Sequence, residues 1–258
     1  MSFPGFTTSE ARALYHASLI FFSAMRTVAG FDLPSVLLQR HLIMDDRIHR
    51  FAARHGRFQV LEIACGLSPR GLSVRQRYGD RVQYYEADLP GMAMRKRALL
   101  NRFSAVGPHH HVLDINVLSP AGADSLESVM SVHLDPAMPT IVITEGLVNY
   151  FDTPTIEGVW RRIATELKRF PAGMYLTDLH SDHDRTPTMR WIRMGQRVVG
   201  TVARGSITLH YGDDSSVQRA FRGLGFSQVQ VHNPDTYTPQ LPYERTRAPA
   251  MIRVVEAG

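Results

Sequence analysis

Short apolar runs alternate with longer segments of helical pattern between residues 58 and 179, and this alternation constrains the fold more than any other feature. The predicted strands cover residues 58–64, 82–87, 112–113, 141–143 and 174–179. The predicted helices extend from the first strand to about residue 77 and then cover 91–102, about 121–132 and 154–168. Because βαβ units connect parallel strands through right-handed crossovers, the sequence predicts an α/β fold built on a parallel sheet.

Two parts of the chain lie outside this alternation. Residues 8–55 have a helical pattern of apolar positions, so we expect a helical cap over 1–55 and a second domain over 56–258. The polar stretch 181–212 is predicted to be an insertion on the substrate side. A last helix around 214–224 precedes two strand-like pieces, 226–231 and 250–255, which predict a closing β-hairpin at one sheet edge.

Composition excludes several classes of protein. The single cysteine, Cys65, excludes an internal disulfide, a cysteine zinc cage and dithiol redox chemistry. No apolar run approaches the length of a membrane span, and Glu10 and Arg12 interrupt the N-terminal segment, so we expect a cytoplasmic protein without a membrane partner. The net charge of +5 comes from scattered arginines, and we therefore expect no nucleic-acid partner.

Polar residues follow four of the predicted strands. Gly66 lies in a tight turn after the first strand, and Asp88 ends the second. Asp114 and Glu145 follow the third and fourth. Because ligands of open parallel sheets bind beyond the carboxyl ends of the strands, we expect a nucleotide site there, in which Asp88 accepts ribose hydroxyls and Asp114 an adenine amino group.

Four motifs in this order resemble class I S-adenosylmethionine (SAM) dependent methyltransferases, and more narrowly the leucine carboxyl methyltransferase family with its bacterial small-molecule O-methyltransferase relatives. The motifs are residues 59–70 (QVLEIACGLSPR), 85–90 (YEADLP) with Lys96 after them, 111–114 (HVLD) and 144–150 (TEGLVNY). The resemblance covers roughly residues 36–232. It implies a Rossmann-like, seven-stranded, mostly parallel sheet of order 3-2-1-4-5-7-6 with helices on both faces, SAM as cofactor and S-adenosylhomocysteine (SAH) as product.

The resemblance also implies roles for the residues around the first two strands. Gly66 would line the methionine part of SAM, and Arg70 would hold or orient its carboxylate. Asp88 would take the ribose hydroxyls, with Glu86 on the same strand face as a second candidate. Glu62, at the end of the first strand, is placed in the same cofactor site.

Later strands and the N-terminal segment are expected to complete the cofactor site. Asp114 and the backbone of Ile115 would bind adenine, while Glu145, followed by Gly146, would meet the ammonium or methionine moiety. An arginine of the N-terminal segment would complete the carboxylate site. Our first choice is Arg40, ahead of Arg47 and Arg26.

The first turn departs from the family pattern. The family has two glycines and an acidic residue where this chain has Ala64, Gly66 and Ser68. We expect SAM binding to survive if the φ angle of Ala64 is negative. The departure keeps open a second reading, a catalytically silent scaffold protein with the same fold.

The acceptor site is predicted from position and charge. His180 and His183 are candidate general bases for an alcohol or phenol acceptor, whereas a carboxylate acceptor needs no base. The surrounding cluster (Asp178, His180, Asp182, His183 and Asp184) is also compatible with a metal site or a plain polar loop, and we expect no metal. Residues expected to contact the acceptor are Tyr150, Arg190, Arg193 and Arg197.

The sequence thus predicts methyl transfer from SAM to a small-molecule acceptor, most readily at oxygen, in a biosynthetic pathway. Transfer to nitrogen or sulfur stays open. A nicotinamide-binding enzyme is disfavoured because the turn lacks the G-x-G-x-x-G spacing.

Overall fold

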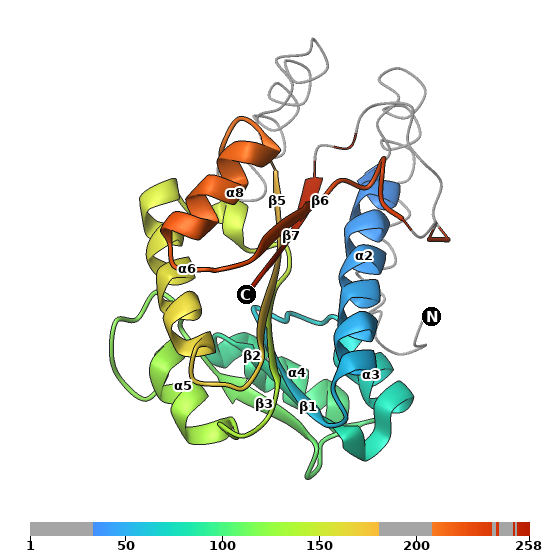
Figure 1. Cartoon of the computed structure of the whole chain (residues 1–258). Helices are drawn as coiled ribbons and strands as arrows, with labels where there is room; N and C mark the ends of the chain where they lie inside the picture. The colour runs from blue at the N-terminus through green and yellow to red at the C-terminus, as the bar shows by residue number, and fades with distance from the viewer. Residues whose placement is uncertain (1–32, 181–207, 239–240, 243–249, 251) are drawn as a thin grey trace, which may run out of the picture.

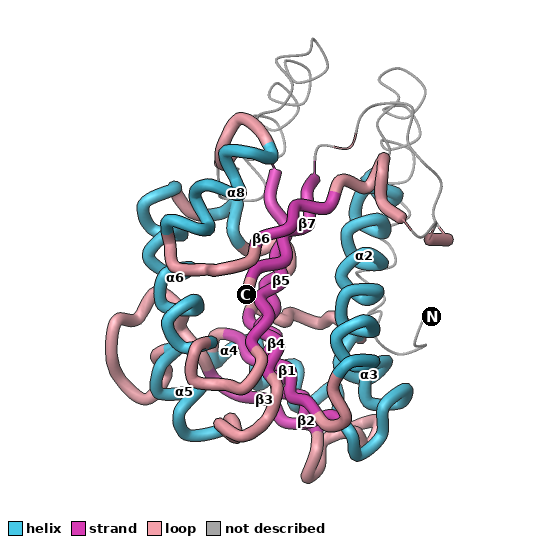
Figure 2. Tube along the Cα trace, viewed as in Figure 1, coloured by secondary structure: helices cyan, strands magenta, loops and turns pink. Residues whose placement is uncertain are grey.

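A central seven-stranded sheet organises the computed structural model, which describes residues 33–180, 208–238, 241–242, 250 and 252–258 (Figures 1 and 2). The strand order is β3-β2-β1-β4-β5-β7-β6, as the sequence resemblance implied. The strands are β1 (Phe58–Ile63), β2 (Val82–Asp88), β3 (His110–Asp114), β4 (Thr140–Thr144), β5 (Gly173–His180), β6 (Val229–His232) and β7 (Ile252–Ala257). β1 to β5 pair in parallel, and β7 is antiparallel to both β5 and β6.

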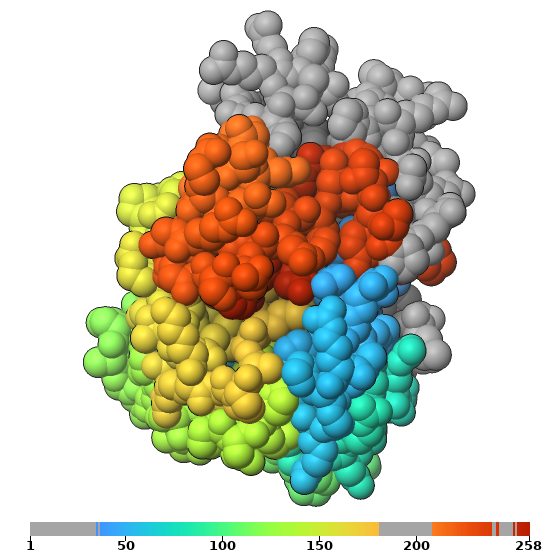
Figure 3. All heavy atoms as spheres, in the orientation of Figure 1, coloured from blue at the N-terminus to red at the C-terminus, as the bar shows by residue number. Residues whose placement is uncertain are grey.

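Helices cover both faces of the sheet (Figure 2). One face packs against α2 (Leu33–Arg54), α3 (Arg70–Tyr78) and α4 (Pro90–Asn101). The other packs against α5 (Leu126–His133), α6 (Thr153–Leu167) and α8 (Asp214–Gly223). Neighbouring strand residues point to opposite faces of the sheet and so contribute to different cores. Val60 lies in the core on the α2 face, and Leu61 lies in the core on the α6 face. In Figure 3, α2, α6 and α8 form much of the visible surface.

Local sequence signals explain where three helices begin. The side chains of Ser125, Asp152 and Asp213 accept hydrogen bonds from the backbone N–H groups at the starts of α5, α6 and α8. Pro154 occupies the first turn of α6, where a missing N–H costs nothing. These helices therefore start within one residue of their capping signals, and α5 starts later than the predicted residue 121 because its cap is Ser125.

The described part of the predicted cap is a layer of the main domain. Ile43, Met44 and Ile48 of α2 are fully buried in the core that contains β1 and β4. α2 also contacts β5 and β7. The predicted boundary at residues 55 and 56 coincides with the end of α2, but α2 itself packs on the sheet, while residues 1–32 lie outside the described part. Among the described residues, no helix combines the length and apolar character that a membrane crossing requires.

An ion pair joins α2 to β7 and makes the fold sensitive to acid. Arg47 donates two hydrogen bonds to Glu256, and Nε2 of His232 lies 3.5 Å from Glu256 Oε2. Although burial raises it, the pKa of Glu256 falls to about 2 because His232 and Arg47 stabilise the carboxylate. A lowered carboxyl pKa stabilises the fold above the unfolded-state pKa, and this contribution is lost as the pH falls from about 4.5 towards 2.

We therefore expect Glu256→Gln to lower the free energy of unfolding by about 2 kcal/mol at pH 7. The difference from the parent protein should shrink at pH 3, as the parent loses the same contribution. Urea unfolding at both pH values measures this. Glu127→Gln, whose side chain is 37% exposed and whose Oε2 lies 3.6 Å from Arg162 Nη1, is the control and should change stability little. An equal deficit for Glu256→Gln at both pH values would contradict the assignment.

Candidate functional site

The turn Ala64–Pro69 connects β1 to α3 at the carboxyl edge of the sheet. Ala64 and Gly66 have φ angles of 54° and 51°, so two of three consecutive residues adopt the left-handed conformation. The expectation that SAM binding survives depended on a negative φ at Ala64, and the structure does not meet that condition. An alanine there is strained by its Cβ, whereas Gly66 carries no such penalty.

The strain at Ala64 leads to a stability prediction. Ala64→Gly removes the left-handed penalty of about 1–2 kcal/mol and adds a glycine cost in the unfolded chain of roughly half that size. We expect the variant to be more stable by about 0.5–1 kcal/mol, measured by urea unfolding. Gly66→Ala, the matched opposite change in the same turn, should destabilise the protein. A destabilised Ala64→Gly variant would contradict this account.

Asp88 links the turn to the second strand. Its Oδ2 accepts the Gly66 N–H at 2.8 Å, and its Oδ1 accepts the Leu89 N–H at 2.8 Å. The residue is partly exposed, so each carboxylate oxygen keeps lone-pair capacity for a further donor. The predicted role of Asp88 requires this free acceptor capacity.

The end of β3 carries the predicted adenine residues. Asp114 is exposed, and its Oδ1 lies 3.6 Å from Arg97 Nη2. Ile115 is buried, and its N–H donates to the Asp88 carbonyl at 2.9 Å. Asp114 can thus reach a ligand, whereas the Ile115 N–H already has a partner, so the predicted contact of the Ile115 backbone with adenine would have to use its carbonyl oxygen.

Arg40 of α2 lies at the ends of β4 and β5. Its Nε donates to Glu145 Oε1 at 3.0 Å and its Nη1 to Asp178 Oδ2 at 2.7 Å. A Cβ on Gly146 would lie 3.1 Å from Arg40 Nη2, so the arginine packs directly on this glycine. Gly146 has a φ of 69°, and its N–H donates to Asp178 Oδ1 at 2.6 Å. The Arg40 side chain is 16% exposed.

Arg70 occupies a deeper position than predicted. Its side chain has no exposed surface, and it pairs with Glu62 at 2.9 Å, Asp45 at 2.8 Å and Glu145 at 2.5 Å. Glu62 is 2% exposed and also accepts the Tyr84 hydroxyl at 2.7 Å. The placement of Arg70 and Glu62 as direct ligand contacts therefore needs correction. Both lie beneath the surface, where Glu62 pairs with Arg70 and Arg70 holds Glu145 in place.

The combined cluster has more carboxylates than guanidiniums. Arg40 and Arg70 face four carboxylates (Asp45, Glu62, Glu145 and Asp178), with His41 Nδ1 3.2 Å from Glu145 Oε2. Although burial raises it, the pKa of Glu145 lies well below its usual range because of Arg70 and His41. Glu145 is therefore ionised at neutral pH, and the cluster favours a cationic group beside it.

Glu86 lies in a separate buried cluster. It is fully buried, its Oε2 lies 3.0 Å from Lys96 Nζ, and its Oε1 lies 3.3 Å from His110 Nε2. The prediction that Glu86 takes ribose hydroxyls needs correction, because α3 and α4 cover it. Asp88, two residues later on the same strand face, extends beyond that cover.

Two residues that were predicted to act on or contact the methyl acceptor lie at the ends of β5 and of the short helix η2 (Val148–Tyr150). They are His180 and Tyr150. His180 follows Asp178 at the end of β5, and both its backbone N–H and its Nδ1 lie within 3.2 Å of Asn149 Oδ1. Burial lowers the pKa of His180 below its ordinary value. Tyr150 is 62% exposed.

Other predicted residues fall outside the described part: Arg26, His183, Arg190, Arg193 and Arg197. Arg47, the second choice for the carboxylate, pairs with Glu256 away from this edge. Within the described ranges no group of three or more histidine, cysteine or carboxylate side chains is arranged to hold a metal ion. Burial raises the pKa of the Cys65 thiol, which makes it a poor nucleophile.

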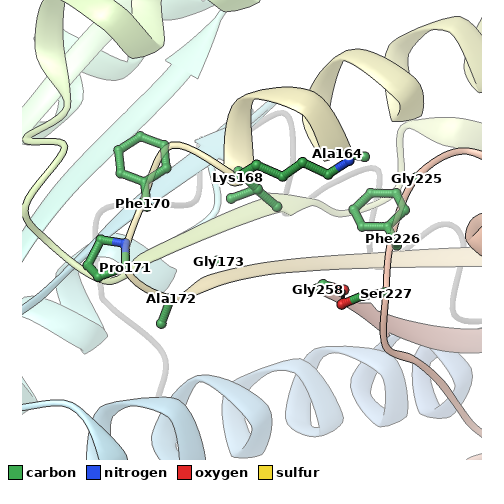
Figure 4. Close-up of a pocket in the computed structure, with 11 residues that line it drawn as sticks. Ala164, Lys168, Phe170, Pro171, Ala172, Gly173, Gly225, Phe226, Ser227 and Gly258 are labelled. Atoms are coloured by element: carbon green, nitrogen blue, oxygen red, sulfur yellow. Dashed lines mark hydrogen bonds between the residues drawn. The ribbon is translucent and has the colours of Figure 1, made fainter.

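A surface hollow of about 190 Å³ lies at the other end of the sheet. Figure 4 shows it between the start of β5 and the chain end, lined by Lys168, Phe170, Gly173, Phe226 and Gly258. Because it adjoins the amino end of β5, it does not belong to the carboxyl-edge site.

Sequence reasoning missed several residues of the cluster. Asp178 was considered only within the polar cluster that follows the fifth strand, as part of a metal site, a general base or a plain loop, and His41 and Asp45 were not singled out. The spacing of four between His41 and Asp45 puts them on one face of a helix, which is a weak signal in a helix that also carries Asp46 and Arg50. Only the packing of α2 against the strand ends distinguishes these pairs.

Comparisons with known proteins relate the chain to a family and to a fold. The sequence model of the family described as leucine carboxyl methyltransferase matches residues 15–164. The chain is 25% identical over 188 residues to a protein of Mycobacterium avium (strain 104) that carries the name of an S-adenosyl-L-methionine-dependent methyltransferase, covering 71% of this chain and 56% of that protein. The chain thus spans just over half the length of this curated relative.

Solved structures share the fold. A protein of Thermobifida fusca YX named as a methyltransferase superposes with a TM-score of 0.63 at 17% identity, covering 97% of this chain and 88% of the other. The S-adenosylmethionine-dependent methyltransferase SibL in its apo form gives 0.58 at 12% identity, covering 98% of this chain and 59% of SibL. At these identities the similarity shows the class I methyltransferase fold.

Proposed function

Because the chain belongs to the leucine carboxyl methyltransferase family, we propose that it is a SAM-dependent methyltransferase that binds SAM at the carboxyl edge of its sheet and methylates a small molecule. The observation that carries this proposal is the alignment of three features at that edge. They are the Ala64–Pro69 turn, the Asp88 carboxylate and the charged cluster around Arg40.

The residues at this edge fit the parts of SAM. Asp88 would accept the ribose hydroxyls, and Asp114 would accept the adenine amino group. The Arg40 guanidinium, on a side chain that is 16% exposed, would hold the carboxylate. SAM supplies a methyl group on a positively charged sulfonium, and this chain also offers the excess of carboxylates around Glu145 that favours cations.

The protein's part in the transfer is mostly positioning. Methyl transfer from a sulfonium to a nucleophile neutralises charge, so proximity and orientation contribute most of the rate. Oxygen is the acceptor we favour, because a carboxylate needs no base and a hydroxyl has His180 nearby. Asn149 Oδ1 already accepts the His180 backbone N–H, so the neutral imidazole places its proton on Nδ1 and keeps the Nε2 lone pair for a substrate proton.

Calorimetric titration of the purified chain with SAM and SAH, with NAD as the control ligand, tests the proposal. We expect micromolar binding of SAM or SAH and none of NAD. Binding of neither SAM nor SAH would favour the silent scaffold, and binding of NAD alone would favour a nicotinamide enzyme. Acceptor screening with detection of SAH then tests turnover.

A further inference from the structure

Lys96 of α4 is completely buried, although it carries an ammonium group. Burying a charge is costly unless partners compensate for it. It is one of only two lysines in a chain with 27 arginines, and the other, Lys168, is exposed. A lysine that does not reach the solvent cannot serve solubility, so its charge must have another role.

The partners of Lys96 come from two other elements. Its Nζ donates to the Ser68 carbonyl at 2.5 Å and lies 3.0 Å from Glu86 Oε2. Glu86 in turn is fixed between His110 and the start of α3, because a Cβ on Gly71 would lie only 2.1 Å from Glu86 Oε1. Glu86 therefore holds the ammonium, and the ammonium holds the end of the Ala64–Pro69 turn.

This turn needs external support. It contains the strained Ala64 and the left-handed Gly66, and its internal hydrogen bond joins the Ser68 N–H to the Cys65 carbonyl at 3.0 Å. Its first half is tied to β2, through Cys65 N–H to the Ala87 carbonyl and Gly66 N–H to Asp88. The described contact that ties its second half to β2 and α4 runs through Lys96.

We propose that Lys96 is a positioning residue that holds the Ala64–Pro69 turn in the conformation that binds SAM. The inference rests on the proposed function. By holding the Ser68 carbonyl, Lys96 keeps the Gly66 N–H directed at Asp88. The turn and the Asp88 carboxylate, which would bind the ribose, then form one rigid surface. The ammonium does not contact the ligand, and its effect passes through the backbone of the turn.

A charge-balanced pair of variants separates this role from a purely structural one. Lys96→Met alone leaves Glu86 buried without its cation and should lower stability. The double variant Lys96→Met with Glu86→Gln removes both charges and should recover much of that stability. We expect SAH affinity to stay about tenfold or more below that of the parent protein in the double variant, because the Ser68 carbonyl still lacks its donor.

Two further variants serve as controls. Glu86→Gln alone leaves the ammonium beside Ser68 without its carboxylate and should weaken SAH binding less than the double variant does. Lys168→Met removes the exposed lysine at the opposite end of the sheet (Figure 4) and should change neither stability nor affinity. SAH affinity in the double variant equal to that of the parent would overturn the proposal.

A measurement on the unmutated chain covers the case in which the Lys96 variants do not fold. Protein labelled with ¹⁵N-lysine gives two ammonium resonances, assigned with Lys168→Met. We expect SAH to shift the Lys96 resonance and leave that of Lys168 unchanged. An unmoved Lys96 resonance at saturating SAH would overturn the positioning role, whereas a parent protein that does not bind SAH would instead overturn the proposed function.

Discussion

Asp88→Asn is expected to weaken SAH binding by about a hundredfold or more. The carboxylate would accept two ribose hydroxyls, and a hydrogen bond to a charged group contributes about 1.5–3 kcal/mol. Asparagine has nearly the same size, but it replaces one acceptor oxygen with a donor NH₂ group. That group would also face the N–H of Gly66 or Leu89, both of which donate to Asp88. Calorimetric titration with SAH measures the loss.

The control for Asp88 lies at the other end of the same strand. Asp80, just before β2, has an 86% exposed side chain, and Asp80→Asn should bind SAH as the parent protein does. Thermal unfolding of Asp88→Asn shows whether the domain remains folded. A folded Asp88→Asn variant whose dissociation constant stays within threefold of the parent value would remove Asp88 from the site.

Arg70→Met should produce the largest loss of stability. The guanidinium is wholly buried between Glu62, Asp45 and Glu145, so its removal leaves unpaired carboxylates inside the protein. Removal of one partner from a buried ion pair typically costs about 3–5 kcal/mol. Urea unfolding at pH 7 should show a deficit in this range. Arg77→Met, an exposed change on the same helix, should alter stability little.

The same variant has a predictable pH dependence. Without Arg70, burial raises the folded-state pKa of the neighbouring carboxyls, and a raised carboxyl pKa destabilises the fold above the unfolded-state value. Protonation at lower pH relieves that penalty. The deficit of Arg70→Met should therefore be smaller at pH 5 than at pH 7. A deficit that grows on acidification would mean that the carboxylates are not the source of the loss.

Much of the fold was predictable from local pattern. The alternation of short apolar runs with helical segments identified β1, β2, β4 and β5 to within two residues, since buried parallel strands are apolar on both faces. The closing pair β6 and β7 is antiparallel at the sheet edge, as expected, but the two strands begin three and two residues later in the chain than predicted. Strand boundaries depend on pairing partners, which local pattern does not contain.

The candidate site was only partly predictable. The polar residues beyond the strands do gather at one edge, but their depth differs. Glu86 and Asp88 share a strand face by alternation, yet Glu86 is fully buried and Asp88 is partly exposed. Arg70 and Arg40 show the same contrast, with 0% and 16% of their side chains exposed. Alternation specifies the face of a residue, whereas its depth depends on which helices cover that face.

The sequence by itself determined the fold class, the family and the edge of the sheet at which polar residues collect, because these follow from periodicity and from motifs of neighbouring residues. Tertiary structure decided which charges neutralise one another. Arg40 and Asp178 are 138 residues apart in the chain and 2.7 Å apart in space, and Lys96 meets the Ser68 carbonyl across 28 residues. The energy of a charge in a protein depends on distance and on burial, and the packing of α2, α3 and α4 against the strand ends sets both.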